Sequence, residues 1–163
     1  MIHHILVATD GSENAERAVR FSAQVADRRV QAEVTVVYVH LRAVPPVLPA
    51  SSALDPARAF QALQPESLVP EGMSAEERAQ AQQIVNAAVR EIRRLVTSPD
   101  VSISGRIVVS ERVEEGMLHE ARETKADMIV VGTRGLSPLR GAIMGSVSHA
   151  LIEKAECPVL VVK

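Results

Sequence analysis

The sequence predicts an open α/β fold, in which a parallel sheet carries helices on both of its faces. Short apolar runs alternate along the chain with segments of helical periodicity, which is typical of this fold class. Strand, helix and strand follow one another between Ile2 and Val39, within the length of a right-handed βαβ unit. Several of the apolar runs are nearly continuous, as in parallel strands that are buried on both faces.

The first third of the chain supplies the elements of this unit. Ile2–Thr9 is a nearly unbroken apolar run and predicts the first strand. Asp10–Ser12 predicts a turn, after which Ser12 can cap a helix that ends near Arg29. The β-branched run Val34–Val39 predicts the second strand.

The middle of the chain begins with a change of character. Leu41–Gly72 is rich in proline and has no sustained period, so we expect an insertion here, with a short helical turn at Asp55–Leu63. Ser74–Glu77 forms a capping box and predicts the start of a long helix that stops before Pro99. The alternation in Val101–Val109 indicates a half-buried strand near an edge of the sheet.

The last third repeats the alternation of helix and strand. Ser110 or a neighbour is expected to begin a helix, although Gly116 inside it costs about 1 kcal/mol relative to Ala. Met128–Val131 predicts a short buried strand, Val147–Lys154 a final helix and Pro158–Lys163 a final strand. The whole chain of 163 residues is expected to form one domain.

Composition limits the partners that we expect. The net charge is −2 and no long basic run is present, so neither nucleic acid nor a membrane surface is an expected partner. The sequence contains no apolar run of about 20 residues and no targeting segment is recognised, so we expect a cytoplasmic location.

The single cysteine and the first histidines are not expected to form a site. One cysteine, Cys157, cannot build a disulfide framework, and we interpret it as a small buried hydrophobic residue. His3 and His4 have no ligand-type neighbour at metal-binding spacing, which favours a solvated entry to the first strand.

A glycine-containing loop after the Met128–Val131 strand predicts a phosphate cradle. Gly132 and Gly135 allow a turn and the close approach of a ligand, and Gly145 and Ser146 open a helix whose first N–H groups lack helical partners. Such helix starts attract anions. The alternative is that these glycines only interrupt a loop before a helix.

Asp10 would lie beside this cradle if the first strand and the Met128–Val131 strand are neighbours in the sheet. Ligands of open α/β sheets bind beyond the carboxyl ends of the strands, where the strand order reverses. A carboxylate near phosphates requires a metal ion, a water or a ribose hydroxyl between them, so Asp10 is a candidate Mg²⁺ ligand, directly or through water. Asp-Gly is also a common turn pair, and both roles can coexist.

These residues resemble the ATP-binding branch of the universal stress proteins, the UspA-like superfamily. That branch has a glycine, two residues, a second glycine, nine residues and then glycine followed by Ser or Thr, which Gly132, Gly135, Gly145 and Ser146 reproduce. The resemblance extends over Ile5–Asp10, Asp127–Gly135 and Gly145–Lys163, and it leaves the proline-rich insertion outside.

The resemblance implies a Rossmann-like fold of the adenine nucleotide alpha hydrolase type, with five parallel strands in the order 3-2-1-4-5. It implies ATP with Mg²⁺ as the ligand, adenine near Val39 and ribose near the fourth strand. The other positions that match contacts to adenine, ribose, phosphates or Mg²⁺ are Ala8, Thr9, Asp10, Val131, Gly132, Gly135, Gly145, Ser146, Val147 and Ser148. Arg134 and Arg140 lie in the loop without a firm match and remain candidates for phosphate contacts.

The family resemblance also implies a homodimer that covers the apolar edge Val159–Val162 by antiparallel pairing with a second copy. We hypothesise an ATP-binding regulatory protein that signals nucleotide occupancy to an unknown protein partner. One alternative is a slow ATPase or phosphotransfer enzyme, for which Asp10 is the nearest acid, while His119 and His149 have no acid partner at suggestive spacing. Another alternative is a nucleotide-free interaction dimer.

Overall fold

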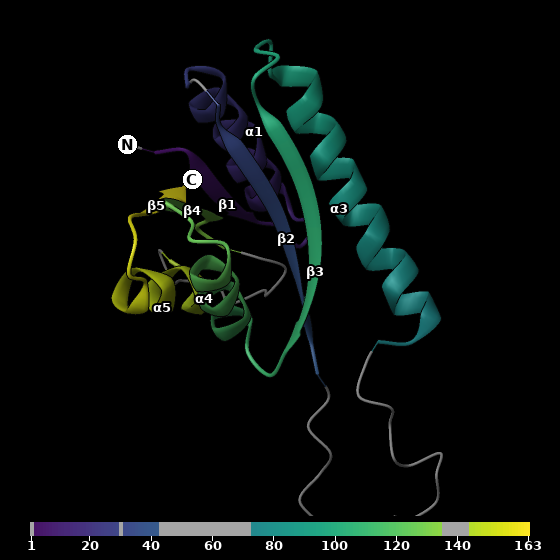
Figure 1. The fold of residues 1–163 in the computed structure, drawn as a ribbon. Helices are drawn as coiled ribbons and strands as arrows, with labels where there is room; N and C mark the ends of the chain where they lie inside the picture. Colours follow the sequence, from purple (N-terminus) through teal and green to yellow (C-terminus); the bar gives the residue numbers. More distant parts are fainter. Residues whose placement is uncertain (1, 30, 43–72, 135–143) are drawn as a thin grey trace, which may run out of the picture.

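The computed structural model describes residues 2–29, 31–42, 73–134 and 144–163, and these form a parallel sheet with helices on both faces (Figure 1). The sheet has five strands in the order β3-β2-β1-β4-β5, which confirms the predicted topology. β3 forms one edge, as its half-buried pattern predicts. The strands are β1 (His4–Ala8), β2 (Glu33–Leu41), β3 (Ser102–Ser110), β4 (Met128–Gly132) and β5 (Val159–Val162).

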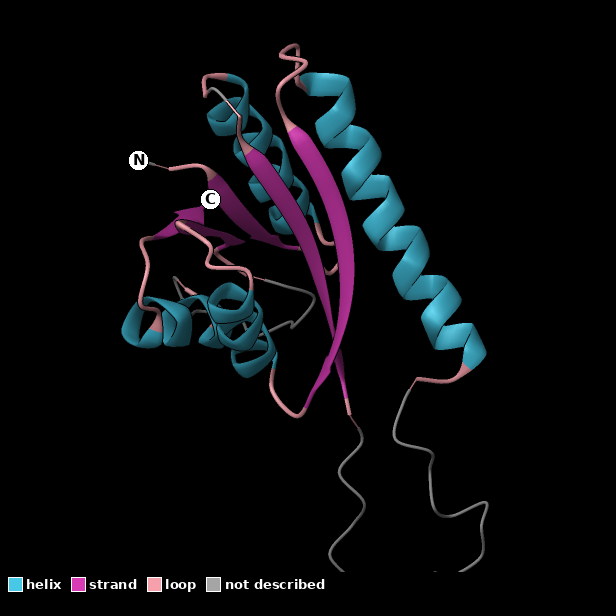
Figure 2. Cartoon of the chain, viewed as in Figure 1, coloured by secondary structure: helices cyan, strands magenta, loops and turns pink. Residues whose placement is uncertain are grey.

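The helices are divided between the two faces of the sheet. α1 and α3 pack against each other on one face, and α4 and α5 pack against each other on the other (Figure 2). α1 covers β1 and β4, whereas α4 covers β2 and β3. The helices are α1 (Glu13–Asp27), α3 (Ala75–Leu95), α4 (Val113–Glu123) and α5 (Ser146–Lys154).

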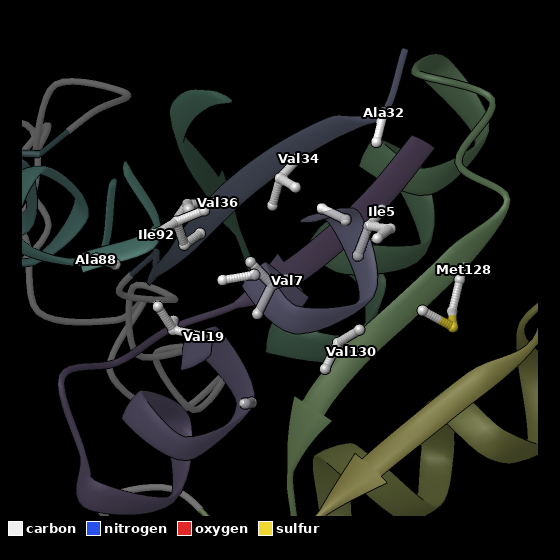
Figure 3. Packing of buried hydrophobic residues seen from close by; sticks show 13 residues of the cluster. Ile5, Val7, Val19, Ala32, Val34, Val36, Ala88, Ile92, Met128 and Val130 are labelled. Atoms are coloured by element: carbon white, nitrogen blue, oxygen red, sulfur yellow. The ribbon is translucent and has the colours of Figure 1, made fainter. Parts of the chain in front are cut away.

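Two aliphatic clusters fill the space between the sheet and its helices. Because side chains alternate between the faces of a strand, Ile5 and Val7 of β1 point toward α1, while Leu6 points toward α4 and α5. Figure 3 shows the first cluster, in which Val19 of α1 and Ile92 of α3 lie over the central strands. The near-continuous apolar runs are therefore buried on both faces, as predicted.

Capping residues fix the starts of α1 and α3. The hydroxyl of Ser12 accepts a hydrogen bond from the backbone N–H of Ala15 at 3.3 Å. At α3 the predicted capping box is complete: Ser74 accepts from the backbone of Glu77 at 3.1 Å, and the Glu77 carboxylate accepts from the backbone of Ser74 at 2.9 Å.

α4 begins later than the sequence predicts. Ser110 is the last residue of β3, and its carbonyl accepts a hydrogen bond from the backbone of Arg42 at 2.8 Å. The N-cap of α4 is Arg112, whose side chain makes no capping hydrogen bond. Pairing with the end of β2 therefore keeps Ser110 in the sheet and delays the helix.

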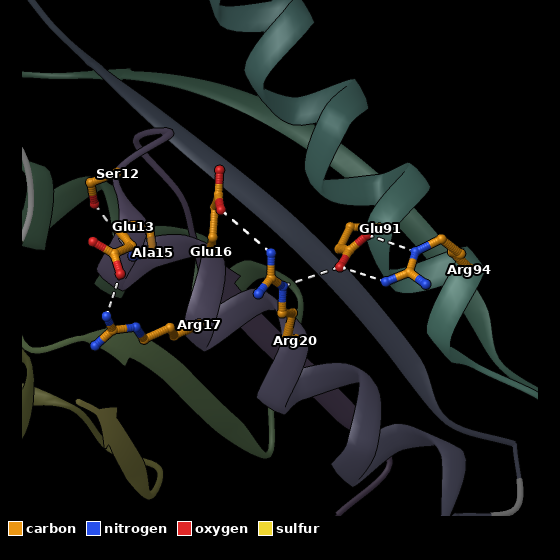
Figure 4. A network of polar contacts seen from close by, with 8 residues as sticks. All are labelled: Ser12, Glu13, Ala15, Glu16, Arg17, Arg20, Glu91 and Arg94. Atoms are coloured by element: carbon orange, nitrogen blue, oxygen red, sulfur yellow. Dashed lines mark hydrogen bonds and ion pairs between the residues drawn. The ribbon is translucent and has the colours of Figure 1, made fainter.

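Exposed ion pairs join α1 to α3 (Figure 4). Arg20 of α1 contacts Glu91 of α3 at 3.1 Å, and Arg94 contacts the same carboxylate at 3.0 Å. The hydrogen bond from Arg94 lowers the pKa of Glu91. Exposed pairs of this kind contribute about 0–1 kcal/mol each to stability. The apolar clusters therefore hold the helices in place, and the ion pairs help to orient α1 relative to α3.

The expectation of a solvated entry to β1 is wrong for His4. Its side chain is buried, with Nδ1 2.9 Å from the carbonyl of Thr124 and Nε2 2.8 Å from the hydroxyl of Thr35. His3 is exposed, as expected. Thr35 and Thr124 lie far from His4 in the sequence, which is why the local pattern did not reveal these partners.

Cys157 is half-buried, and this burial raises the pKa of its thiol. Little of the thiol is therefore ionised at neutral pH, in agreement with a packing role.

The proline-rich segment lies largely outside the described residues. Leu41 ends β2, but residues 43–72, including the helical turn predicted at Asp55–Leu63, are not among the residues that the structure describes.

Asp127 should make the stability of the folded protein depend on pH. Its carboxylate accepts hydrogen bonds from the backbone of His3 and His4 at 2.8 and 2.9 Å, which hold its pKa below the ordinary value of 3.8. A lowered folded-state pKa stabilises the protein above pH 3.8, and this stabilisation is lost as the pH falls through the folded value.

We predict that Asp127→Asn lowers the free energy of unfolding at pH 7 and that its difference from the wild type shrinks below pH 3.8. Urea unfolding from pH 7 to pH 2.5 measures the effect, and Asp100→Asn in an exposed turn is the control. A difference that stays constant over this range would show that the carboxylate charge is not what stabilises the start of β1.

Candidate functional site

A pocket of about 710 Å³ opens at the carboxyl ends of β1, β2 and β4. β1 pairs with β2 on one side and with β4 on the other, so the pocket lies where the strand order reverses. The pairing of β1 with β4 meets the condition under which Asp10 and the glycine-containing loop become neighbours, and both contribute to the pocket.

Every predicted site residue within the described part of the chain lines this pocket. Gly135 and Arg140 lie outside the described residues. The predicted residues that line it are Ala8, Thr9, Asp10, Val39, Val131, Gly132, Arg134, Gly145, Ser146, Val147 and Ser148.

Sequence reasoning missed several lining residues, most of them apolar. Val37 and Leu41 lie two residues before and after Val39, so strand periodicity places all three on one face and could have found them. Val113 could not be found this way, because it reaches the pocket from the start of α4. The missed residues are Ala15, Val37, Leu41, Val113, Thr133, Met144 and His149.

Hydrogen bonds donated by backbone N–H groups hold the turn at Asp10. The N–H of Thr9 donates to the carbonyl of Val37 at 2.9 Å, which continues the pairing with β2 beyond β1. The Asp10 carboxylate then accepts from the backbone of Ser12 at 2.9 Å, and Gly11 adopts a φ of 78°. The predicted turn role of Asp10 is therefore present.

The start of α5 is the electropositive side of the pocket. The first turns of α1, α3 and α4 each carry two acidic residues, whereas α5 has none, and no side chain caps it among the described residues. The backbone N–H groups of Ser146 and Val147 belong to this first turn and have no partner within the helix. This helix end favours a negatively charged group.

Hydrogen bonds tie this helix start to the end of β4. The carbonyl of Thr133 accepts from the backbone of Gly145 at 2.6 Å and from the hydroxyl of Ser148 at 3.2 Å. The Ser148 hydroxyl also lies 3.0 Å from the carbonyl of Gly145 and is buried. Ser148 thus positions the loop ends, while Ser146 is exposed at the same helix turn.

Space, rather than an unusual backbone angle, accounts for Gly132 and Gly145. Gly132 is the last residue of β4, so a turn does not begin at this residue. A Cβ on Gly132 would lie 2.8 Å from the backbone carbonyl group of Asn14 in α1. A Cβ on Gly145 would lie 3.0 Å from the carbonyl oxygen of Thr133. Helix packing therefore excludes a side chain at Gly132, whereas the tight loop leaves little room for one at Gly145.

Among the described residues, no group of three or more His, Cys, Asp or Glu side chains could hold a metal ion. Any cation in the pocket would need further ligands besides Asp10. Across the same residues, no helix combines the length and the apolar character needed to cross a membrane.

The sequence profile of the Universal stress protein family matches residues 1–163. The chain belongs to the universal stress protein family. The stress response protein NhaX of Bacillus subtilis is 30% identical, over 98% of this chain and 96% of that protein. The universal stress protein YxiE of the same bacterium is 28% identical over the full length of both chains.

A solved universal stress protein shares the fold. The protein from Archaeoglobus fulgidus, in complex with dAMP, aligns over all of both chains with a TM-score of 0.66 and 25% identity. The parallel sheet with order 3-2-1-4-5 is therefore the fold of this family.

We predict that Ser148→Ala destabilises this universal stress protein by about 1 kcal/mol, because it removes the buried donor to the carbonyl of Thr133. Ser146→Ala, at an exposed position of the same turn, should change the free energy of unfolding little. Urea unfolding of both variants makes the comparison. Equal effects of the two substitutions would refute the positioning role of Ser148.

Proposed function

We propose that this chain binds ATP together with Mg²⁺ in the 710 Å³ pocket and acts as a nucleotide-dependent regulatory module in stress responses. The proposal rests on one feature of the pocket: one of its walls is apolar, and another is the start of a helix that no described side chain caps. An adenine nucleotide has a matching division into a flat base and an anionic tail. The volume lies within the range of small-molecule sites, about 300–1,000 Å³.

The apolar wall is the place for adenine. Val37, Val39 and Leu41 of β2 line one side, and Val113 of α4 lines the pocket as well. Leu41 is 52% exposed, so a bound base would cover apolar surface that now faces water. Covering such surface favours binding at about 25 cal/mol per Å².

The phosphates belong at the start of α5. The backbone N–H groups of Ser146 and Val147 can donate to phosphate oxygens, and Gly145, the N-cap of α5, lines the pocket without a side chain. Arg134 is exposed at the rim of the pocket and supplies positive charge there.

Asp10 is the residue that would hold Mg²⁺. One oxygen of its carboxylate accepts the turn hydrogen bond from Ser12, and carboxylates have further acceptor positions that suit a cation or a coordinated water. When bound, Mg²⁺ supplies positive charge between this carboxylate and the phosphates. The ion would complete its coordination with phosphate oxygens and water, because Asp10 is the only carboxylate among the described lining residues.

Regulation fits the pocket better than rapid catalysis. Its described ionisable side chains are Asp10, Arg134 and His149, and His149 is exposed on α5. Three ionisable side chains are few for the acid, base and charge-stabilising roles that rapid phosphoryl transfer needs. The solved relative from Archaeoglobus fulgidus, in complex with dAMP, supports an adenine nucleotide as the ligand.

We predict that Gly145→Val abolishes detectable ATP binding while the fold survives. The valine side chain would occupy the approach to the α5 N–H groups, and its Cβ requires only a small shift of the Thr133 carbonyl. Isothermal titration with MgATP measures the binding, and circular dichroism verifies the fold. Glu153→Val, at an exposed position of the same helix, is the control and should bind like the wild type. Retained affinity in Gly145→Val would refute the phosphate site.

We further propose a homodimer formed through the outer edge of β5, the last strand of the described sheet. The carbonyls of Pro158 and Val162 accept hydrogen bonds from Ile129 of β4 and from Thr133 directly after it. The intervening Val159 and Val161 therefore direct their backbone groups away from β4. An apolar strand with unpaired backbone groups at its edge favours pairing with a second copy. The neighbouring α5 also exposes an apolar side chain, that of Ile152, which is 50% exposed.

We predict a dimer by light scattering at micromolar concentration and a monomer for Val161→Pro. Proline removes the N–H that points to the outer edge and leaves the hydrogen bonds between β4 and β5 in place. Circular dichroism shows whether the variant still folds. A wild-type monomer, or a folded Val161→Pro variant that remains a dimer, would contradict pairing through β5.

A further inference from the structure

We propose that Gly116 is a positioning residue for the base-binding end of the pocket. This inference rests on the proposed nucleotide function and adds a residue that does not line the pocket. Gly116 lies inside α4, where glycine is unfavourable by about 1 kcal/mol relative to Ala. The described structure gives a reason for this cost.

α4 touches β2 at Gly116. A Cβ on this glycine would lie 2.9 Å from Cγ1 of Val39 and 3.1 Å from Cβ of Ser110. Gly116 is buried, so an added methyl group would meet protein atoms and not solvent. The absence of a side chain therefore allows the α4 backbone to rest directly on Val39.

This contact sets the width of the apolar end of the pocket. Val39 lines the pocket from β2, and Val113, one helical turn before Gly116, lines it from α4. Both side chains pack into the cluster beneath α4 and α5. A methyl group on Gly116 must push α4 away from β2 or turn Val39 from its position, and either change alters the wall that receives the base.

Gly105 provides a matched control within the same chain. It lies on β3, and a Cβ there would come 2.3 Å from Cγ1 of Val85 in α3, on the opposite face of the sheet. Gly105→Ala and Gly116→Ala thus both press a methyl group against a valine of a packed neighbour. Neither Gly105 nor Val85 lines the described pocket.

The experiment measures ATP affinity and tripolyphosphate affinity in the presence of Mg²⁺. Calorimetry gives the ATP value, and competition by tripolyphosphate against ATP reports the phosphate end alone. We expect Gly116→Ala to weaken ATP binding by about tenfold, the scale of an overpacked contact, and to leave tripolyphosphate affinity unchanged. Gly105→Ala should lower the melting temperature and leave both affinities unchanged.

A second substitution separates positioning from general damage. Val39→Ala removes the methyl group that the new side chain meets, so the Gly116→Ala/Val39→Ala variant should recover part of the ATP affinity that Gly116→Ala loses. If neither Gly116→Ala variant folds while Gly105→Ala does, Gly116 serves folding alone and the inference is wrong.

The outcomes distinguish the two proposals. A wild type that gives no ATP binding overturns the proposed function and this inference together. A wild type that binds ATP, with equal ATP affinities for Gly105→Ala and Gly116→Ala, overturns only the positioning role. A parallel loss of ATP and tripolyphosphate affinity in Gly116→Ala also overturns it, because the effect would then not be confined to the base end.

Discussion

The parallel pairing of β1 with β4 is the contact on which the pocket depends. The register Ile5↔Met128 to Val7↔Val130 brings together two strands that are far apart in the sequence. As a result, the residues that follow β1 and those that follow β4 lie at the same end of the strands, where both line the pocket. Both strands are buried on their two faces, so a slip by one residue would move a whole set of aliphatic side chains to the wrong cluster. The burial that stabilises the sheet therefore also fixes the positions of Asp10 and Gly132.

Close contacts at glycines then set where the helices lie on this sheet. α3 meets β3 at Gly105, α4 meets β2 at Gly116 and α1 meets the end of β4 at Gly132. Two of these contacts, at Gly116 and Gly132, lie beside the pocket and bring a helix start to its wall. Glycine thus shapes the site chiefly by allowing backbones to approach, and only Gly11 among the described glycines has a positive φ.

The sequence predicts the fold and much of the pocket because both depend on local patterns. The capping box at Ser74 and the buried run of β4 need no knowledge of distant partners. His4 shows the limit: the lack of ligand-type neighbours nearby favoured a solvated position, but the side chain is buried and contacts Thr35 and Thr124, which are remote in sequence. Val113 shows the same limit for the pocket, because only the packing of α4 on Val39 brings it to the wall.

The proposed function holds that one pocket receives both ends of ATP, the base against Val39 and the phosphates at the start of α5. A crystal structure of the chain with MgATP tests this most directly. We expect density for the base between Val39 and Val113, and phosphate oxygens within hydrogen-bonding distance of the backbone N–H groups of Ser146 and Val147. A fully occupied nucleotide bound elsewhere, or an empty pocket at saturating MgATP, would contradict it.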